Sequence, residues 1–276
     1  MQKISAVINT RNEEQNIRYC FETLKWCDEI IVVDMESEDK TVEIAREYTD
    51  KIYNHEKVLA FDVARKFAVD QATGEWVLLI DADEMVPKTL ADSLLKIVEE
   101  NRIDIVEVPF KHYIMGAWIK HSGWGYTPMP RFFRRGMIEF AETIHGYMRK
   151  VANAGTLRLE SKEENCIEHF NYIDSSHFVE KLNRYTSVEA LHLFQSGESF
   201  SRWKLCKTAF REFYNRYYKA KGYRDGVRGF SLCVMMTFYR ALSFIKLWEM
   251  QQFKDEAVPA RYERIKQEIL TRWKAK

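Results

Sequence analysis

The sequence predicts an α/β fold in which helices cover both faces of a mostly parallel sheet, followed by a helical carboxyl-terminal region. Up to about residue 170, short β-branched runs alternate with amphipathic stretches, whereas the later part has helical periodicity throughout. The 46% hydrophobic content is typical of a folded chain with a full core. We therefore expect a sheet-containing domain over residues 1–173 and a helical region over 174–276.

Five apolar runs in the first part have the length of β-strands. They cover residues 4–8, 29–33, 51–53, 76–80 and 105–110. Strands that alternate with helices favour parallel pairing, because each crossover helix packs on a face of the sheet. Polar clusters follow the first, second and fourth runs. Since parallel strands end at one edge, where α/β sheets bind ligands, we expect these clusters to meet there.

Helical patterns lie between and after these strands. We expect helices over 17–24, 42–48, 61–72 and 90–98, and in the second part over 178–194, 202–219, 227–253 and 259–273. Asn12 is a candidate N-cap for the first helix. Thr89 and Asp92 have the spacing of a capping box at the fourth helix.

Basic and aromatic residues alternate in the carboxyl-terminal region. Between Arg202 and Arg228, nine Lys or Arg residues stand against two acids, although the whole chain carries only +1. This pattern suits an anionic membrane surface, and ordinary packing against the first domain explains it equally well. Arg240 and Lys246 interrupt the most apolar stretch, so no membrane-spanning helix is predicted. The near-neutral total charge does not favour a nucleic-acid partner.

The amino terminus enters a predicted strand directly and shows no secretory signal, so we expect a cytoplasmic protein. Its five cysteines contain no Cys-x-x-Cys pair. Neither a disulfide framework nor a zinc site is expected. The sequence does not indicate an oligomeric state.

Asp81 and Asp83 follow the fourth strand directly. Two carboxylates spaced in this way at a strand end can approach one Mg²⁺ or Mn²⁺ ion, which prefers oxygen ligands and shares its shell with substrate phosphates. A solvated acidic turn or a helix cap is the alternative interpretation of an isolated Asp-x-Asp. The sequence around Asp81 and Asp83 favours the metal site over an acidic turn or a helix cap.

Three segments resemble, in order, the family 2 glycosyltransferases, whose GT-A (Rossmann-like) fold is a mixed nucleotide-sugar-binding sheet. They are residues 5–14, 29–41 and 74–84, the last containing Asp81-Ala82-Asp83. Three further segments are similar to lipopolysaccharide-core β-1,4-glucosyltransferases. They are residues 167–172, 180–186 and 221–230.

The resemblance implies an inverting, metal-dependent hexosyltransferase. It would move a hexose, with glucose expected, from a UDP-sugar to a sugar hydroxyl of a glycolipid such as the lipopolysaccharide or lipooligosaccharide inner core. It would act as a peripheral protein on the inner face of the cytoplasmic membrane.

The resemblance also assigns site residues. The nucleotide pocket would be lined by Thr10, Arg11, Glu13 and Asp34, with Asp81 contacting ribose or metal. Asp83 would be the direct metal ligand, completed by Asp81 and His169.

Each of these assignments has an ordinary structural alternative. Glu13 also suits a helix N-terminus, Asp34 a turn cap, and His169 a hydrogen bond to backbone in the core. Met35 stands where many relatives have a second acidic residue, which leaves the contact with the base open.

The acceptor side is less specific. Glu142 is the candidate base that takes the acceptor hydroxyl proton. Relatives commonly have Glu after the histidine, whereas this chain has Gly146, so His145 and Glu84 stay open as bases.

A predicted acceptor loop contains Gly123 and Trp124, and Trp124 suits sugar stacking or packing equally well. Arg131 is expected to contact phosphate or an anionic acceptor, with a solvated strand edge as its alternative.

Two other functions share parts of this pattern. A sugar nucleotidyltransferase uses a similar sheet and acidic site, but it usually has a Gly-rich loop after the first strand, where this chain has Thr10-Arg11-Asn12-Glu13. A non-catalytic, membrane-associated protein that binds nucleotide sugars would keep the fold without turnover. The complete acidic edge favours the enzyme.

Overall fold

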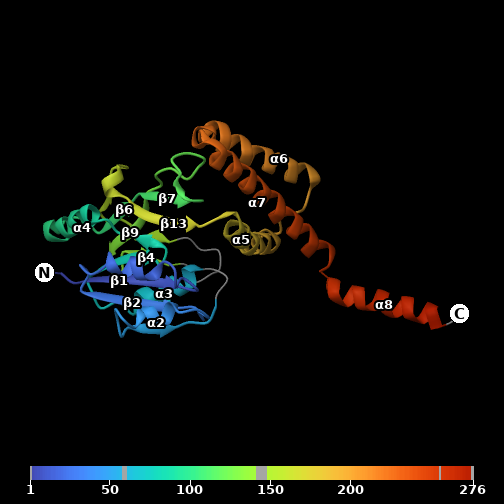
Figure 1. Ribbon diagram of the computed structural model, residues 1–276, viewed down its shortest axis with the longest axis horizontal. Helices are drawn as coiled ribbons and strands as arrows, with labels where there is room; N and C mark the ends of the chain where they lie inside the picture. The colour runs from blue at the N-terminus through green and yellow to red at the C-terminus, as the bar shows by residue number, and fades with distance from the viewer. Residues whose placement is uncertain (1, 58–60, 141–147, 255, 275–276) are drawn as a thin grey trace. The chain divides into compact units, whose positions relative to one another are not determined.

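The computed structural model describes residues 2–57, 61–140, 148–254 and 256–274. Its contacts divide the chain into two compact units, Met1–Phe178 and Val179–Lys276, which we call unit 1 and unit 2. Unit 1 contains the β-sheets, and the described part of unit 2 is helical (Figure 1). The predicted α/β class with a helical carboxyl-terminal region is confirmed.

The main sheet of unit 1 has seven strands in the order β12-β6-β9-β4-β1-β2-β3. These are β1 (Ile4–Thr10), β2 (Glu29–Asp34), β3 (Ile52–Asn54), β4 (Trp76–Asp81), β6 (Ile105–Val108), β9 (Met129–Arg134) and β12 (Thr156–Arg158). β3, β2, β1 and β4 pair in parallel, while β9 runs antiparallel to both β4 and β6. The sheet is therefore mixed.

A second sheet of four strands has the order β5-β13-β7-β8. Its strands are β5 (Glu84–Met85), β7 (Phe110–Ile114), β8 (Ala117–Trp118) and β13 (Ile167–Tyr172), and β10 (Ile138–Glu139) pairs separately with β11 (Arg149–Lys150). The predicted single strand over 105–110 is wrong, because Pro109 separates β6 from β7. Proline has no N–H to continue the ladder, so the chain passes here from one sheet to the other.

The helices of unit 1 lie between its strands. They are α1 (Ile17–Glu22), α2 (Thr41–Ala45), α3 (Phe61–Asp70) and α4 (Lys88–Glu100). Both predicted caps are wrong. Asn16 is the N-cap of α1, while Asn12 accepts a hydrogen bond from the Glu38 N–H at 2.8 Å. Thr89 lies inside α4 and donates its hydroxyl to the Glu164 carbonyl at 2.9 Å.

Hydrophobic side chains pack on both faces of the main sheet. Ala6 and Ile8 belong to one buried cluster and Val7 to another, because alternate residues of a strand point to opposite faces. Every residue of β1 is buried. β1 is thus a central strand that holds the polar residues at its end rigidly.

Unit 2 is built from long helices. α5 (Ser175–Gln195) enters it, and α6 (Arg202–Tyr214), a π-helical turn (Asn215–Lys219), α7 (Gly226–Gln252) and α8 (Val258–Lys274) follow. α6 lies alongside α7 (Figure 1). The five cysteines of the chain are free thiols.

The segment Gly222–Gln252 is long and apolar enough to cross a membrane by length and composition, contrary to the prediction from its two interrupting cations. Within unit 2 these cations contact neighbouring helices. Arg240 forms ion pairs with Glu189 at 3.1 Å and Glu212 at 3.5 Å. Lys246 donates to the Asn183 carbonyl of α5 at 2.7 Å.

Candidate active site

Three strand ends meet at one edge of the main sheet. Thr10 of β1 is paired with Asp34 of β2, and Asn9 of β1 is paired with Asp81 of β4. All three strands are parallel, so their carboxyl ends carry the polar clusters to the same edge.

The loops after β1 and β2 are joined by hydrogen bonds. Asp34 accepts the Ser37 N–H at 3.0 Å and the Ser37 hydroxyl at 2.5 Å, and Ser37 in turn accepts the Asn12 N–H at 2.9 Å. The Glu13 carboxylate accepts the Asn16 side-chain amide at 2.8 Å beside α1. Asp34 therefore caps its own turn, and its contact with a base stays a prediction.

Polar atoms at the end of β1 are buried without hydrogen-bond partners in the described part of the chain. They are both amide atoms of Asn9, the Thr10 hydroxyl and the Arg11 Nε. Buried polar atoms normally have a partner, because leaving one unpaired costs free energy. Their grouping where three strands end is what a ligand-binding surface would require.

Asp81 lies between two arginines. Its carboxylate accepts Arg65 of α3 at 3.0 and 3.1 Å and Arg131 of β9 at 3.0 Å. Burial opposes ionisation of this carboxyl, but Arg65 and Arg131 outweigh it and hold the pKa of Asp81 well below its usual range. Asp81 is therefore ionised and held in place by both guanidinium groups.

Glu84 is fully buried beneath the Asp81–Asp83 turn. One oxygen accepts the Asp81 N–H at 2.8 Å, and the other accepts Arg131 at 2.9 Å. Burial raises the pKa of Glu84 to about 7, although Arg131 opposes the shift. Glu84 thus links β4, β5 and β9 and fixes the turn that carries both aspartates.

His169 and Asp83 lie together although they are far apart in the sequence. The His169 Nε2 is 3.4 Å from an Asp83 oxygen, and its Nδ1 is 3.7 Å from Glu84. Burial opposes protonation of His169, but Asp83 outweighs it and raises the pKa of the imidazole. In the second sheet Glu84, His169 and His112 form one cross-strand row.

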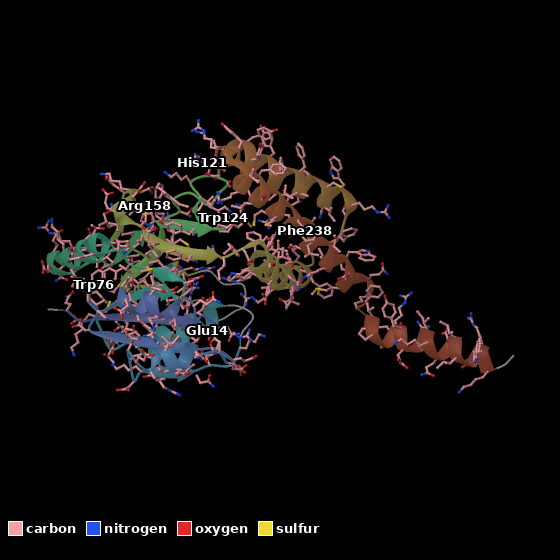
Figure 2. All side chains as sticks on the ribbon, in the orientation of Figure 1. Glu14, Trp76, His121, Trp124, Arg158 and Phe238 are labelled. Atoms are coloured by element: carbon pink, nitrogen blue, oxygen red, sulfur yellow. The ribbon has the colours of Figure 1, made fainter. Side chains whose placement is uncertain are left out.

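This row contacts Trp124 of the predicted acceptor loop, which is labelled in Figure 2. His112 lies 5.1 Å from His169 and 5.6 Å from Trp124 between ring centroids, and burial lowers the pKa of His112 to about 3. Ser122 and Gly123 have positive φ angles of 60° and 80°. This left-handed pair turns the chain so that Trp124 packs against the row.

A divalent cation fits part of this arrangement. Asp83 and His169 offer a carboxylate oxygen and an imidazole nitrogen side by side, and the remaining ligands of such an ion commonly come from phosphates and water. Asp81 is engaged by arginines, and within the described ranges no three Asp, Glu, His or Cys side chains converge as a metal-binding group. The residues therefore fit a two-ligand site completed by substrate.

The structure brings most of the predicted residues together. Asp81, Asp83, His169, Trp124 and Arg131 are joined by the contacts above, and Arg131, only 4% exposed, is no solvated strand edge. Its contact with an acceptor stays a prediction. Glu142 and His145 lie outside the described residues.

Sequence reasoning missed Arg65 and His112. Arg65 lies 16 residues before Asp81 in a helix that has no visible site signal. His112 becomes part of the row only through strand register.

Comparison with known proteins places this site in context. The Glycosyl transferase family 2 model matches residues 5–152. The chain is 27% identical to the lipopolysaccharide core biosynthesis glycosyltransferase LpsC of Rhizobium meliloti, covering 91% of this chain and 94% of that protein. It is 29% identical to the uncharacterized glycosyltransferase RT0209 of Rickettsia typhi, over 91% of this chain and 88% of the other. The crystal structure of S. aureus TarS matches with 19% identity and a TM-score of 0.47, covering 91% of this chain and 55% of that chain.

Proposed function

The chain belongs to glycosyl transferase family 2, and from that premise we propose that this glycosyltransferase moves a hexose from a UDP-sugar to a sugar hydroxyl of a glycolipid, with inversion. We propose glucose as the hexose and the lipopolysaccharide or lipooligosaccharide inner core as the acceptor. The Rhizobium meliloti relative, which is named for lipopolysaccharide core biosynthesis, supports this acceptor class.

One observation carries the proposal. The Asp83 carboxylate and the His169 imidazole lie 3.4 Å apart beside Asp81, at the edge where three strands end. A strand-end carboxylate beside an imidazole is a suitable donor pair for Mg²⁺ or Mn²⁺. When bound, such an ion would stabilise the charge of the departing diphosphate.

The protein's own residues would divide the work as follows. Asp83 and His169 hold the cation, and Asp81, fixed by Arg65 and Arg131, contacts the ribose or the metal. Thr10, Arg11, Glu13 and Asp34 line the nucleotide pocket.

Glu84 is unsuited to act as the base, because it is fully buried and both of its oxygens already accept hydrogen bonds. Glu142, with His145 as the second candidate, therefore stays our proposal for the group that takes the acceptor proton.

On the acceptor side, we propose that Gly123 and Trp124 receive the sugar and that Arg131 orients the site.

Unit 2 would hold the enzyme at the inner face of the cytoplasmic membrane. In support, Trp203 of α6, within the basic and aromatic region, is 74% exposed, and Phe238 of α7 (Figure 2) is 49% exposed. Basic side chains with exposed aromatic rings favour an anionic lipid surface.

A donor screen tests the proposal. The purified full chain is incubated with UDP-sugars, Mn²⁺ and a heptose-containing lipid acceptor, and UDP release is followed by linkage analysis of the product. Asp83→Asn and His169→Gln should each lower turnover roughly 10²-fold or more, since each removes a group that serves the leaving diphosphate.

Asp70→Asn, an equivalent change on the exposed surface of α3, is the matched control and should be silent. Release of pyrophosphate in place of UDP would identify a nucleotidyltransferase. Binding of UDP-sugars without turnover of any of them would identify a non-catalytic protein.

A further inference from the structure

α8 is exposed along its length. None of its described side chains is buried, and every residue from 259 to 274 is exposed. Trp273 is 80% exposed and Ile269 is 58% exposed. Large apolar side chains on a helix usually pack against a core, so these residues need an explanation.

Five apolar side chains of α8 share one face, which we call the α8 stripe, while Leu270 lies outside it. With about 3.6 residues per turn, its members fall within an arc of roughly 80°. The members are Val258, Tyr262, Ile265, Ile269 and Trp273. No described residue buries this narrow apolar face, so the helix is suited to meet an apolar surface.

Basic residues border the α8 stripe on both sides. Lys266 lies at one border, and Arg261 and Arg272 lie at the other. The two acids of the helix are farther from the stripe and contact basic residues: Glu263 lies 3.8 Å from Lys266, and Glu268 lies 3.1 Å from Arg264. The surface that faces α8 should therefore be apolar at its centre and anionic around it.

We infer that α8 is an interfacial anchor that lies in the plane of a membrane containing anionic lipids. The α8 stripe enters the boundary between headgroups and acyl chains, and its basic borders contact lipid phosphates. A second copy of α8 fits less well, because basic borders would face each other in either a parallel or an antiparallel pair. The purpose of this anchor, to bring the site to a membrane-borne acceptor, rests on the proposed function. Membrane binding by α8 does not.

Vesicle flotation of the full chain tests the inference. Vesicles of phosphatidylcholine alone are compared with vesicles that also contain phosphatidylglycerol. Ile269→Asp should lower the bound-to-free ratio at least about tenfold, because it places a charge in the stripe. The matched control Thr271→Asp adds the same charge on the opposite side of the helix and should bind like the parent.

Charge reversal tests the borders. Arg272→Glu should weaken binding to the phosphatidylglycerol vesicles more than Lys274→Glu, which lies away from the stripe. Equal binding by Ile269→Asp and the parent would overturn the inference. So would a parent dimer in light scattering without lipid that Ile269→Asp dissociates, since a second copy would then cover the stripe.

Two further measurements separate this inference from the proposed function. The double variant Arg211→Glu/Lys219→Glu reports on α6 and the turn after it. If only this variant releases the chain from vesicles, α8 is not the anchor. UDP release on a soluble acceptor analogue should be unchanged in Ile269→Asp. If the parent turns over no UDP-sugar, the proposed function fails, while flotation still decides the role of α8.

Discussion

Thr10 shows how a buried side chain without a hydrogen-bond partner in the protein can indicate contact with a ligand. Its hydroxyl is buried at the end of β1 and has no hydrogen-bond partner in the described ranges. A buried, unpaired hydroxyl lowers stability, so a ligand that pairs with it offers a reason for its presence. Stability and ligand affinity should then respond to its removal in opposite directions.

We predict that Thr10→Val leaves the free energy of unfolding unchanged or raises it, because valine has nearly the same shape and no unpaired hydroxyl. Affinity for UDP should fall about five- to tenfold, the worth of about one hydrogen bond. Urea unfolding and calorimetric titration with UDP measure the two effects.

Thr41→Val is the control for Thr10→Val. The Thr41 hydroxyl accepts the Glu13 N–H at 2.7 Å and donates to Asp39 at 2.5 Å, so its loss should destabilise the fold. A Thr10→Val protein with unchanged UDP affinity would contradict the ligand role of Thr10.

Glu84 acts on the site through other residues. We predict that Arg131→Met lowers the free energy of unfolding by about 3 kcal/mol, because it leaves the buried Glu84 without its cationic partner. Glu84→Gln should cost less, about 1–2 kcal/mol, because Asp81 still pairs with Arg131. In the double variant the two losses should not add, and the coupling should exceed about 1 kcal/mol. Urea unfolding of the four proteins measures it.

The exposed pair Lys88 and Asp92, at 2.9 Å, gives the comparison for this cycle, with an expected coupling of about 0.5 kcal/mol or less. Equal coupling in the two pairs would show that Glu84 does not hold Arg131.

At the scale of elements, Glu29 connects the start of β2 to its neighbours. Its carboxylate accepts hydrogen bonds from Ser5 of β1, Lys51 before β3, and the Thr73 N–H before β4 at 2.7 Å. Burial opposes ionisation, but these donors outweigh it and lower the pKa of Glu29 from 4.5 to about 2. One carboxylate thus joins three strands at the edge opposite the candidate site.

We predict that Glu29→Gln destabilises the protein in a pH-dependent way. Because the pKa of Glu29 is depressed in the folded state, its contribution is complete above about pH 5 and is lost as pH falls towards 2. The variant should lose roughly 1–2 kcal/mol at pH 7 and clearly less at pH 3. Urea midpoints at both pH values measure this, and a difference independent of pH would contradict it.

At the scale of the whole molecule, the contact-based division lies five residues after the predicted boundary at residue 173. Unit 1 extends to Phe178, which is buried and packs 4.3 Å from the Tyr172 ring between centroids. The first turn of α5 therefore completes the core behind β13, the strand that carries His169. The assignment of residues 1–173 as the catalytic domain stays a prediction.

We predict that the fragment 1–173 has a lower free energy of unfolding than the fragment 1–195, by about 3 kcal/mol, because it lacks the buried ring of Phe178. Thermal and urea unfolding of both fragments measure this difference. Phe178→Ala in the longer fragment is the matched control and should reproduce most of the loss. If that substitution were silent, Phe178 would not complete the core.

Much of this protein could be predicted from the sequence alone. The fold class, most strands of unit 1, and the positions of Asp81 and Asp83 at a strand end follow from local patterns. Periodicity records which face of each element is buried, and that information is contained within a few residues. The resemblance then placed His169 in the site without any knowledge of its neighbours.

Only the tertiary structure decided how these residues contact one another. Asp81 is held by Arg65 from α3 and Arg131 from β9, and the row of Glu84, His169 and His112 exists only because β5, β13 and β7 pair in that register. Such contacts join residues that are distant in sequence, and their geometry depends on strand pairing that no local pattern records. The sequence therefore determined which groups end at the edge of the candidate site, and the fold decided which of them hold each other in place.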